Sequence, residues 1–250
     1  MHIFYPNIIY PKSDKALEKA FKQCNLTALY NLILTIRDFS EKYPCNSERG
    51  QKPLHFAAMS GQMQLCEKIL GNVGNKYPKD NIGKTPLHYA AENGYYDVCL
   101  LLINNNSDIN AENEYKRTPL HIAARKGHLK ICIFLVEKGA DPNITDCNKQ
   151  TPLHLAAHGG YFSICHYFIE KASLKNPEDS NKNTPLHYAA RYGHLQVCKL
   201  IIDNIEDISS RGRKGYTPLC MAFKKCNFAV CWSLAWKTMM QKWSRFTQRD

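Results

Sequence analysis

The sequence predicts an all-α fold, an α-solenoid in which a helix-turn-helix unit with a hairpin loop recurs along a single elongated domain. Three observations support this fold class. The run Thr-Pro-Leu-His recurs every 33 residues in four intact and two altered copies, without insertion or deletion. The Leu of this run and an Ala three residues after it are present in every copy, and a second stretch with an apolar helical face follows. Sequence periods of about 20 to 50 residues are typical of solenoids and related repeat architectures.

A short helix is expected to begin at the proline of each copy. Thr is a good N-cap, proline is tolerated at the first helical position, and His falls where a capping box has Glu or Gln. Leu87 and Ala90 show the two constant apolar positions, and Gly94 marks the helix end, because glycine accepts the left-handed conformation there. The six copies start at Lys52, Thr85, Thr118, Thr151, Thr184 and Thr217.

A second helix is expected to follow the first in each unit. Apolar residues at positions i, i+4 and i+5, such as Val98, Leu102 and Ile103, give it one apolar face. The loop after this helix is rich in Asn, Gly, Asp and Pro, as in residues 139–143, and leads into a turn such as residues 80–83. One unit therefore consists of a turn, two helices and a long loop.

This unit resembles the ankyrin repeat, above all in Gly83-Lys-Thr-Pro-Leu-His-Tyr-Ala-Ala91 and in residues 118–143. Before the repeats, residues 1–46 are expected to hold a degenerate capping repeat, in which Leu17 and Ala20 take the Leu and Ala positions. A basic, tryptophan-rich helix or cap over residues 232–250 overlaps the last repeat. The resemblance covers residues 47–244 as six repeats, at about 47–79, 80–112, 113–145, 146–178, 179–211 and 212–244.

The cysteine pattern argues against a disulfide framework. Six of the 11 cysteines lie 33 residues apart, each beside the residue that opens the apolar face of a second helix. Neighbouring repeats pack about 10 Å apart, whereas a disulfide needs Cα atoms within about 7 Å. We therefore expect core thiols in a reducing compartment, the cytoplasm or alternatively the nucleus. Cys147, at a predicted hairpin tip, is expected to react first with alkylating reagents.

Neither a catalytic site nor a metal site is expected. His154 and His158 are four residues apart, but His154 belongs to the capping motif and no acidic or cysteine residue is placed to complete a tetrahedral site. The sequence has no glycine-rich phosphate loop after a strand and no nucleophile elbow. The predictions are that the protein is not an enzyme, needs no cofactor or metal, and has no small-molecule substrate.

The charge of the chain indicates where a partner binds. Thirty-three Lys and Arg against 22 Asp and Glu give a net charge of +11, which favours acidic or phosphate-bearing partners. The resemblance implies that the hairpin tips and the exposed ends of the first helices line one concave, protein-binding face. From Glu114 onward this face carries eight basic residues against one acidic residue. The predicted partner-binding residues are Lys84, Tyr115, Arg117, Arg125, Lys126, His158, Arg191, Tyr192, Arg213, Lys214, Tyr216, Lys224 and Lys225.

The predicted function is a non-catalytic scaffold or adaptor whose basic groove holds an acidic segment of another protein. Arg binds carboxylates bidentately and Tyr offers amphipathic contact area, a combination enriched at protein interfaces. Three alternatives stay open. In the first, the basic residues are ordinary solvated surface residues. In the second, the chain is a cytoplasmic module or fragment of a larger membrane channel or scaffold. In the third, the basic, aromatic face binds nucleic acid.

The tail of the chain is predicted to form a basic amphipathic helix. Trp232, Trp236, Met240 and Trp243 fall on one side of it. Such a helix lies on a membrane surface, enters a partner's groove, or caps the last repeat. The second helix of the sixth repeat is expected to end near Ala235. No apolar stretch approaches the roughly 20 residues needed to span a bilayer, and the first residues do not read as an export signal, so the chain is expected to be soluble.

Overall fold

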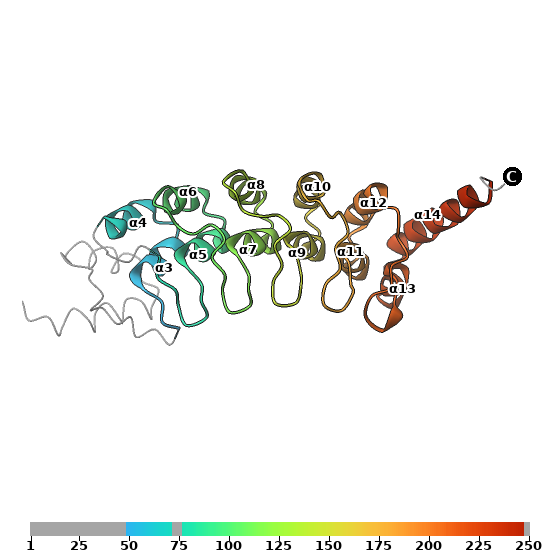
Figure 1. The fold of residues 1–250 in the computed structure, drawn as a ribbon, viewed down its shortest axis with the longest axis horizontal. Helices are drawn as coiled ribbons and strands as arrows, with labels where there is room; N and C mark the ends of the chain where they lie inside the picture. Colours follow the sequence, from blue (N-terminus) through green and yellow to red (C-terminus); the bar gives the residue numbers. More distant parts are fainter. Residues whose placement is uncertain (1–48, 72–76, 248–250) are drawn as a thin grey trace, which may run out of the picture. The chain divides into compact units, whose positions relative to one another are not determined.

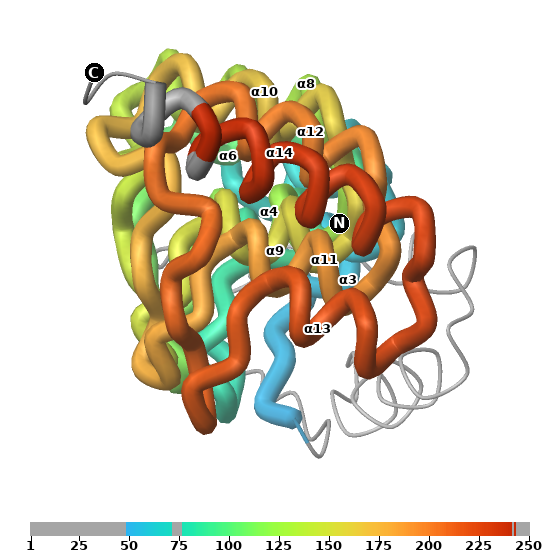
Figure 2. The backbone as a smooth tube through the Cα atoms, turned by 90° about the vertical axis from the view of Figure 1, so that its right-hand side faces the viewer, coloured from blue at the N-terminus to red at the C-terminus, as the bar shows by residue number. Residues whose placement is uncertain are grey.

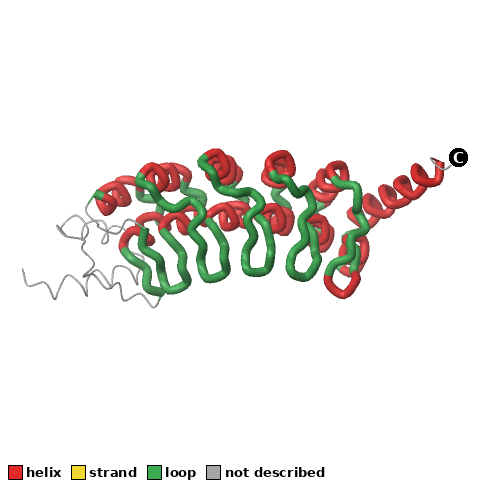
Figure 3. Tube along the Cα trace, viewed as in Figure 1, coloured by secondary structure: helices red, strands yellow, loops and turns green. Residues whose placement is uncertain are grey.

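The computed structural model of the protein describes residues 49–71 and 77–247. The chain divides into two compact units, residues 1–108 (unit 1) and residues 109–250 (unit 2), and each is described by itself. In the described ranges every regular element is a helix (Figure 3), which confirms the predicted all-α class. The predicted N-terminal capping repeat over residues 1–46 lies outside the described residues.

The described part of unit 1 holds two pairs of helices. In each pair the first helix packs on the second, and each helix also contacts its counterpart in the other pair. The constant residues Leu54, Leu87 and Ala90 are buried in this packing, as predicted. The helices are α3 (Pro53–Met59), α4 (Met63–Leu70), α5 (Pro86–Asn93) and α6 (Tyr96–Asn104).

Unit 2 repeats the same arrangement along four helix pairs. The first helices contact one another in order, and so do the second helices, which gives two layers with the hairpin loops beyond the first-helix layer (Figure 1). A 3₁₀ turn, Arg213–Gly215, occupies the last hairpin. The helices are α7 (Pro119–Lys126), α8 (Leu129–Glu137), α9 (Pro152–Gly159), α10 (Phe162–Lys171), α11 (Pro185–Tyr192), α12 (Leu195–Asn204), α13 (Pro218–Lys224) and α14 (Phe228–Thr247).

The first helices begin and end where the sequence predicts. The motif proline is the first residue of each, and the preceding Thr, or Lys52 in the first copy, has the extended conformation of an N-cap. Gly127 ends α7 in the left-handed conformation, with φ of 86°, and a Cβ built there would lie 2.5 Å from the Tyr161 ring. Conformation and close approach both require glycine at this position. In the sixth copy Cys226 takes the left-handed position, with φ of 57°.

The motif histidines join each helix to the next hairpin. In α7 the backbone N–H of Thr118 donates to Nδ1 of His121, and His121 Nε2 lies 3.1 Å from the carbonyl oxygen of Gln150. Because a carbonyl oxygen only accepts, Nε2 carries the proton and Nδ1 accepts. Burial outweighs the bond to Gln150 and lowers the pKa of His121 to about 4, so the ring is neutral. The same bond from Nε2 to the next hairpin is made by His55, His154 and His187.

Four hairpins, those of the second to fifth repeats, are closed by a buried carboxylate or amide. Asp146 Oδ1 accepts the backbone N–H groups of Asn148 and Gln150, at 2.8 and 3.0 Å. Two backbone donors are thereby satisfied inside the loop, which fixes its shape. Asp80, Asn113 and Asp179 close their hairpins with the same pair of bonds.

The periodic cysteines are core residues, as the sequence predicts. The five at positions 66, 99, 132, 165 and 198 are fully buried free thiols, and Cys231 in the last repeat is half-buried. Burial raises the pKa of Cys99 to about 12, so this thiol remains protonated and unreactive. Packing therefore explains the residue type at these positions.

The last helix corrects one prediction. The second helix of the sixth repeat does not end near Ala235, because α14 runs without interruption from Phe228 to Thr247. Residues 228–247 contain neither glycine nor proline, the residue types that most strongly end a helix. The repeat helix and the predicted tail helix are therefore one element.

Candidate protein-binding surface

The predicted binding residues of unit 2 lie on its hairpin loops and at the C-terminal ends of its first helices, here called the hairpin face. Backbone bonds tie neighbouring tips together, since Cys147 N–H donates to Tyr115 O and Ser180 N–H donates to Asn148 O, both over 2.9 Å. The loops therefore present their tip side chains in register from one repeat to the next. Most predicted residues are exposed there: Tyr115, Arg125, Lys126, His158, Arg191, Tyr192, Arg213, Lys214, Lys224 and Lys225.

Three predicted residues meet at the ends of α9 and α11, and Arg125 at the end of α7 acts on them through its charge. The ring centroids of His158 and Tyr192 are 4.3 Å apart, and the Arg191 guanidinium lies over the Tyr192 ring at 5.7 Å. Burial first, and then the positive charge of Arg125, lower the pKa of His158. The structure thus brings a neutral imidazole, a phenol and two guanidinium groups into one exposed cluster.

A second cluster lies on the sixth repeat. Lys224 at the end of α13 holds its ammonium group 5.1 Å from the centre of the Tyr216 ring. Arg213 and Lys214 in the preceding hairpin and Lys225 after the helix are exposed. Cationic groups that stack on aromatic rings keep a defined position while they remain open to a partner.

Two predicted binding residues are half-buried and form ion pairs with neighbouring carboxylates. Arg117 donates from Nε to Asp146 Oδ2 over 3.0 Å, and its side chain is 18% exposed. Lys84, which belongs to unit 1, forms an ion pair with Glu92 at 2.7 Å and lies 4.9 Å from the centre of the Tyr89 ring. The charge of each residue is therefore balanced by a neighbouring carboxylate.

Three exposed lysines at the hairpin tips escaped the sequence reasoning. Lys116, Lys149 and Lys182 have the left-handed conformation, with φ of 53°, 57° and 60°. They lie 33 residues apart and align with Gly83, which is a turn position of the repeat. The signal that could have found them is the recurrence of a positive charge where the repeat calls for glycine. They add three cations to the hairpin face.

The predicted tail residues lie on a different surface. Trp232, Trp236, Met240 and Trp243 are all exposed on α14 and belong to one side of that helix. Of the three alternatives given for this stripe, the structure does not support the one in which it covers the last repeat, because the side of α14 that packs on α12 is the one with the buried residues Val230 and Leu234.

Neither a metal cluster nor a membrane-spanning helix is found among the residues that the structure describes. Within residues 49–71 and 77–247, no three His, Cys, Asp or Glu side chains are grouped as they would be around a metal ion. Over the same ranges, no helix combines the length and the apolar character that crossing a membrane requires.

Comparison with known families agrees with the repeat geometry. A family model described as ankyrin repeats, in three copies, matches residues 17–113, 107–146, 120–212 and 173–243. A search of curated proteins finds no match to the chain. The matched ranges span most of the sequence and include every helix pair described above. The chain therefore belongs to the ankyrin-repeat family.

Proposed function

We propose that the hairpin face of unit 2 binds an acidic segment of another protein, and that the protein serves as a scaffold or adaptor in the cytoplasm. Ankyrin repeats are generally protein–protein interaction modules, and proteins built from them are typically non-catalytic. The observation that carries the proposal is the cluster of Arg125, His158, Arg191 and Tyr192, where exposed cations border an aromatic pair.

The chemistry of this cluster suits carboxylates. A guanidinium group binds a carboxylate through two parallel N–H···O bonds, and tyrosine and arginine are enriched where interfaces are most buried. The tip lysines extend the positive field along the loops, which raises the association rate of an acidic segment at low salt. The segment would lie across neighbouring hairpins, because the tips are held in register by their backbone bonds.

The test is the affinity of a fluorescein-labelled peptide rich in Glu and Asp, measured by anisotropy. Reversing Arg125 and Arg191 to Glu should weaken binding about tenfold or more, a change of roughly 1.4 kcal/mol. Both side chains are exposed, so the melting temperature should not change. Equal affinity of the variant and the wild type would overturn the proposal.

A matched control separates this surface from the total charge. Lys171 on α10 and Lys199 on α12 are also exposed, but they lie on the second-helix layer. Reversing both to Glu changes the net charge by the same amount, and the peptide affinity should stay close to that of the wild type. A single-stranded oligonucleotide of equal length is the second control, because tighter binding of it than of the peptide would favour a nucleic-acid partner.

A further inference from the structure

The end of unit 2 formed by α13 and α14 carries a large exposed apolar surface. We call it the tryptophan face, and it is separate from the hairpin face. Trp232 is 75% exposed, Phe223 71% and Trp236 53%. All three tryptophans of the chain belong to this face. Its members are Phe223, Phe228, Trp232, Trp236, Met239, Met240 and Trp243.

The opposite side of α14 holds the helix in place. Val230 and Leu234 are buried, Lys237 Nζ lies 3.1 Å from Asp203 Oδ1, and Gln241 Nε2 donates to Glu206 O over 3.0 Å. These contacts attach α14 to α12 and to the loop after it, and Figure 2 shows α13 and α14 in front of α11 and α12. The tryptophan face therefore points away from the rest of the unit.

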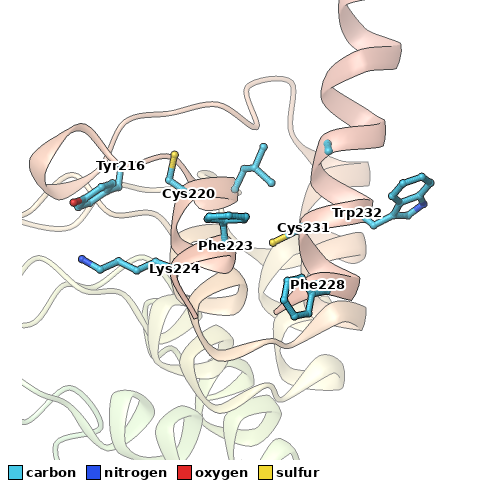
Figure 4. Close-up of a pocket in the computed structure, with 9 residues that line it drawn as sticks. Tyr216, Cys220, Phe223, Lys224, Phe228, Cys231 and Trp232 are labelled. Atoms are coloured by element: carbon cyan, nitrogen blue, oxygen red, sulfur yellow. The ribbon is translucent and has the colours of Figure 1, made fainter. Parts of the chain in front are cut away.

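Part of this face lines an open cavity of about 1050 Å³ between α13 and α14. Figure 4 shows Phe223 between the two helices, with Phe228 and Cys231 on α14 beside it and Trp232 directed away from α13. Lys224 is the one charged residue among those that line it. Trp236, Met239, Met240 and Trp243 continue the apolar stripe along α14 beyond the cavity.

This end of the unit is not built to receive a seventh repeat. Phe223 stands where the other five repeats have a fully buried alanine, which lets neighbouring helices approach closely. Cys220 replaces the histidine whose Nε2 bonds to the next hairpin in the earlier repeats. A bulky ring and a missing hydrogen bond therefore oppose continued stacking.

The charge around the tryptophan face is strongly positive. Residues 211–249 contain nine Lys and Arg and no Asp or Glu, so this segment carries most of the net charge of +11. Among the side chains that the structure describes, the exposed basic residues of this segment are Arg211, Arg213, Lys214, Lys224 and Lys225. Exposed tryptophans flanked by basic residues are the features of a helix that lies in a membrane interface.

We propose that the tryptophan face docks on the surface of an anionic lipid bilayer. The stripe from Phe228 to Trp243 covers 16 residues of helix, about 22 Å from first to last, and a flat surface meets such a stripe along its whole length. A partner helix in the cavity would cover only the stripe residues that line it. A second copy of the chain would bring two positively charged ends together, and like charges oppose that contact. This inference does not rest on the proposed function of the hairpin face.

The experiment uses the full chain with phosphatidylcholine vesicles, with and without phosphatidylserine. We expect sedimentation with the anionic vesicles only, lost at high salt, together with a blue shift of tryptophan emission, because all three tryptophans report this face. Trp232→Glu with Trp236→Glu should lower the partition coefficient about tenfold or more, and Trp243 still reports in that variant. The Arg125→Glu, Arg191→Glu variant is the matched control and should sediment like the wild type.

Several outcomes would overturn the inference. These are the absence of sedimentation, equal sedimentation with neutral and anionic vesicles, and unchanged sedimentation of the Trp232→Glu, Trp236→Glu variant. A doubling of mass in solution that masks the tryptophans, measured by light scattering and emission, would assign the face to a second copy. A blue shift with the acidic peptide in the absence of lipid would assign it to a protein partner. The peptide affinity of the hairpin face is measured separately, so the two proposals can fail independently.

Discussion

Arg117 donates from Nε to Asp146 Oδ2 over 3.0 Å, and this bond joins the hairpins of two neighbouring repeats. The carboxylate of Asp146 is fully buried, so it needs a donor for its second oxygen. In the second and fifth repeats that donor is a tyrosine hydroxyl, from Tyr89 to Asp80 and from Tyr188 to Asp179, each at 2.7 Å. The fourth repeat has Leu155 at the tyrosine position, and Arg117 supplies the bond instead.

Replacing Arg117 with Met should therefore lower the free energy of unfolding by about 1–3 kcal/mol, because it leaves a buried carboxylate oxygen without its donor. Adding Asp146→Asn, which copies the neutral residue found at position 113, should recover most of the loss. Urea unfolding of the two single variants and the double variant gives the coupling energy. Simple additivity of the two changes would show that the pair is not coupled.

The buried motif histidines should make the protein less stable as the pH is lowered. Burial lowers the pKa of His121 and His154 to about 4, whereas the unfolded chain titrates near 6.5. As the pH falls below 6.5 the unfolded chain binds protons first, so stability is complete above 6.5 and declines towards 4. Each histidine should lower the free energy of unfolding by about 2 kcal/mol between pH 6.5 and pH 5, which urea unfolding across that range would measure.

The control for this pH dependence is the substitution of both histidines by Gln. Glutamine can close the capping box but does not titrate. The double variant should be less stable at pH 7, because the bonds from Nε2 to the next hairpin are lost, and its stability should change less between pH 6.5 and pH 5. An unchanged slope would assign the acid sensitivity to other groups.

The helix ends and the histidine bonds could be predicted from the sequence because the repeats keep a constant spacing of 33 residues. Because every copy keeps the same spacing, Pro119 and Gly127 mark the ends of one first helix and predict the ends of the others. The bond from His121 to the next hairpin follows from the same spacing, since the histidine recurs with the loop that it contacts. At these positions the residue types and the periodicity indicate the same structure, so either one is sufficient to predict it.

The features that escaped prediction depend on departures from the period. The bond from Arg117 arises because one repeat has Leu155 where others have tyrosine, and a pattern common to all repeats does not show it. Lys149 occupies a position where the repeat has glycine, so its exposed charge on the hairpin face was not predicted. The exposure of Trp232 follows from which side of α14 packs on α12, and both sides of that helix contain apolar residues. Sequence periodicity alone cannot decide between two apolar sides of one helix.

The left-handed lysines allow charge to be removed without loss of stability. Replacing Lys116, Lys149 and Lys182 with Gly relieves a left-handed conformation that costs a non-glycine residue about 1–2 kcal/mol, against about 0.5–1 kcal/mol of added chain entropy. We expect an unfolding free energy equal to or above that of the wild type, with weaker binding of the acidic peptide and a smaller salt dependence. Unchanged peptide affinity would exclude the tips from the binding surface.

Cysteine reactivity should follow the environment of each thiol. The Thr217 hydroxyl donates to Cys220 Sγ over 3.3 Å and, with the backbone there, lowers the pKa of this exposed thiol. The sequence alone puts Cys147 first, but this contact reverses the expected order: iodoacetamide at pH 7 should modify Cys220 before Cys147, and Cys198 should resist, as followed by peptide mass mapping. Thr217→Val should slow the reaction at Cys220 alone. Faster reaction at Cys147 would show that exposure outweighs the hydroxyl contact.

The central claim is that an acidic protein segment binds the hairpin face, and site-specific photocrosslinking tests it most directly. Tyr192 on α11 and Phe162 on α10 are each 45% exposed but lie on different helix layers, so a benzoylphenylalanine at either site is equally accessible. With the labelled acidic peptide, we predict crosslinks from position 192 that high salt suppresses, and a background yield from position 162. Equal yields at the two positions, or a higher yield at 162, would contradict the claim.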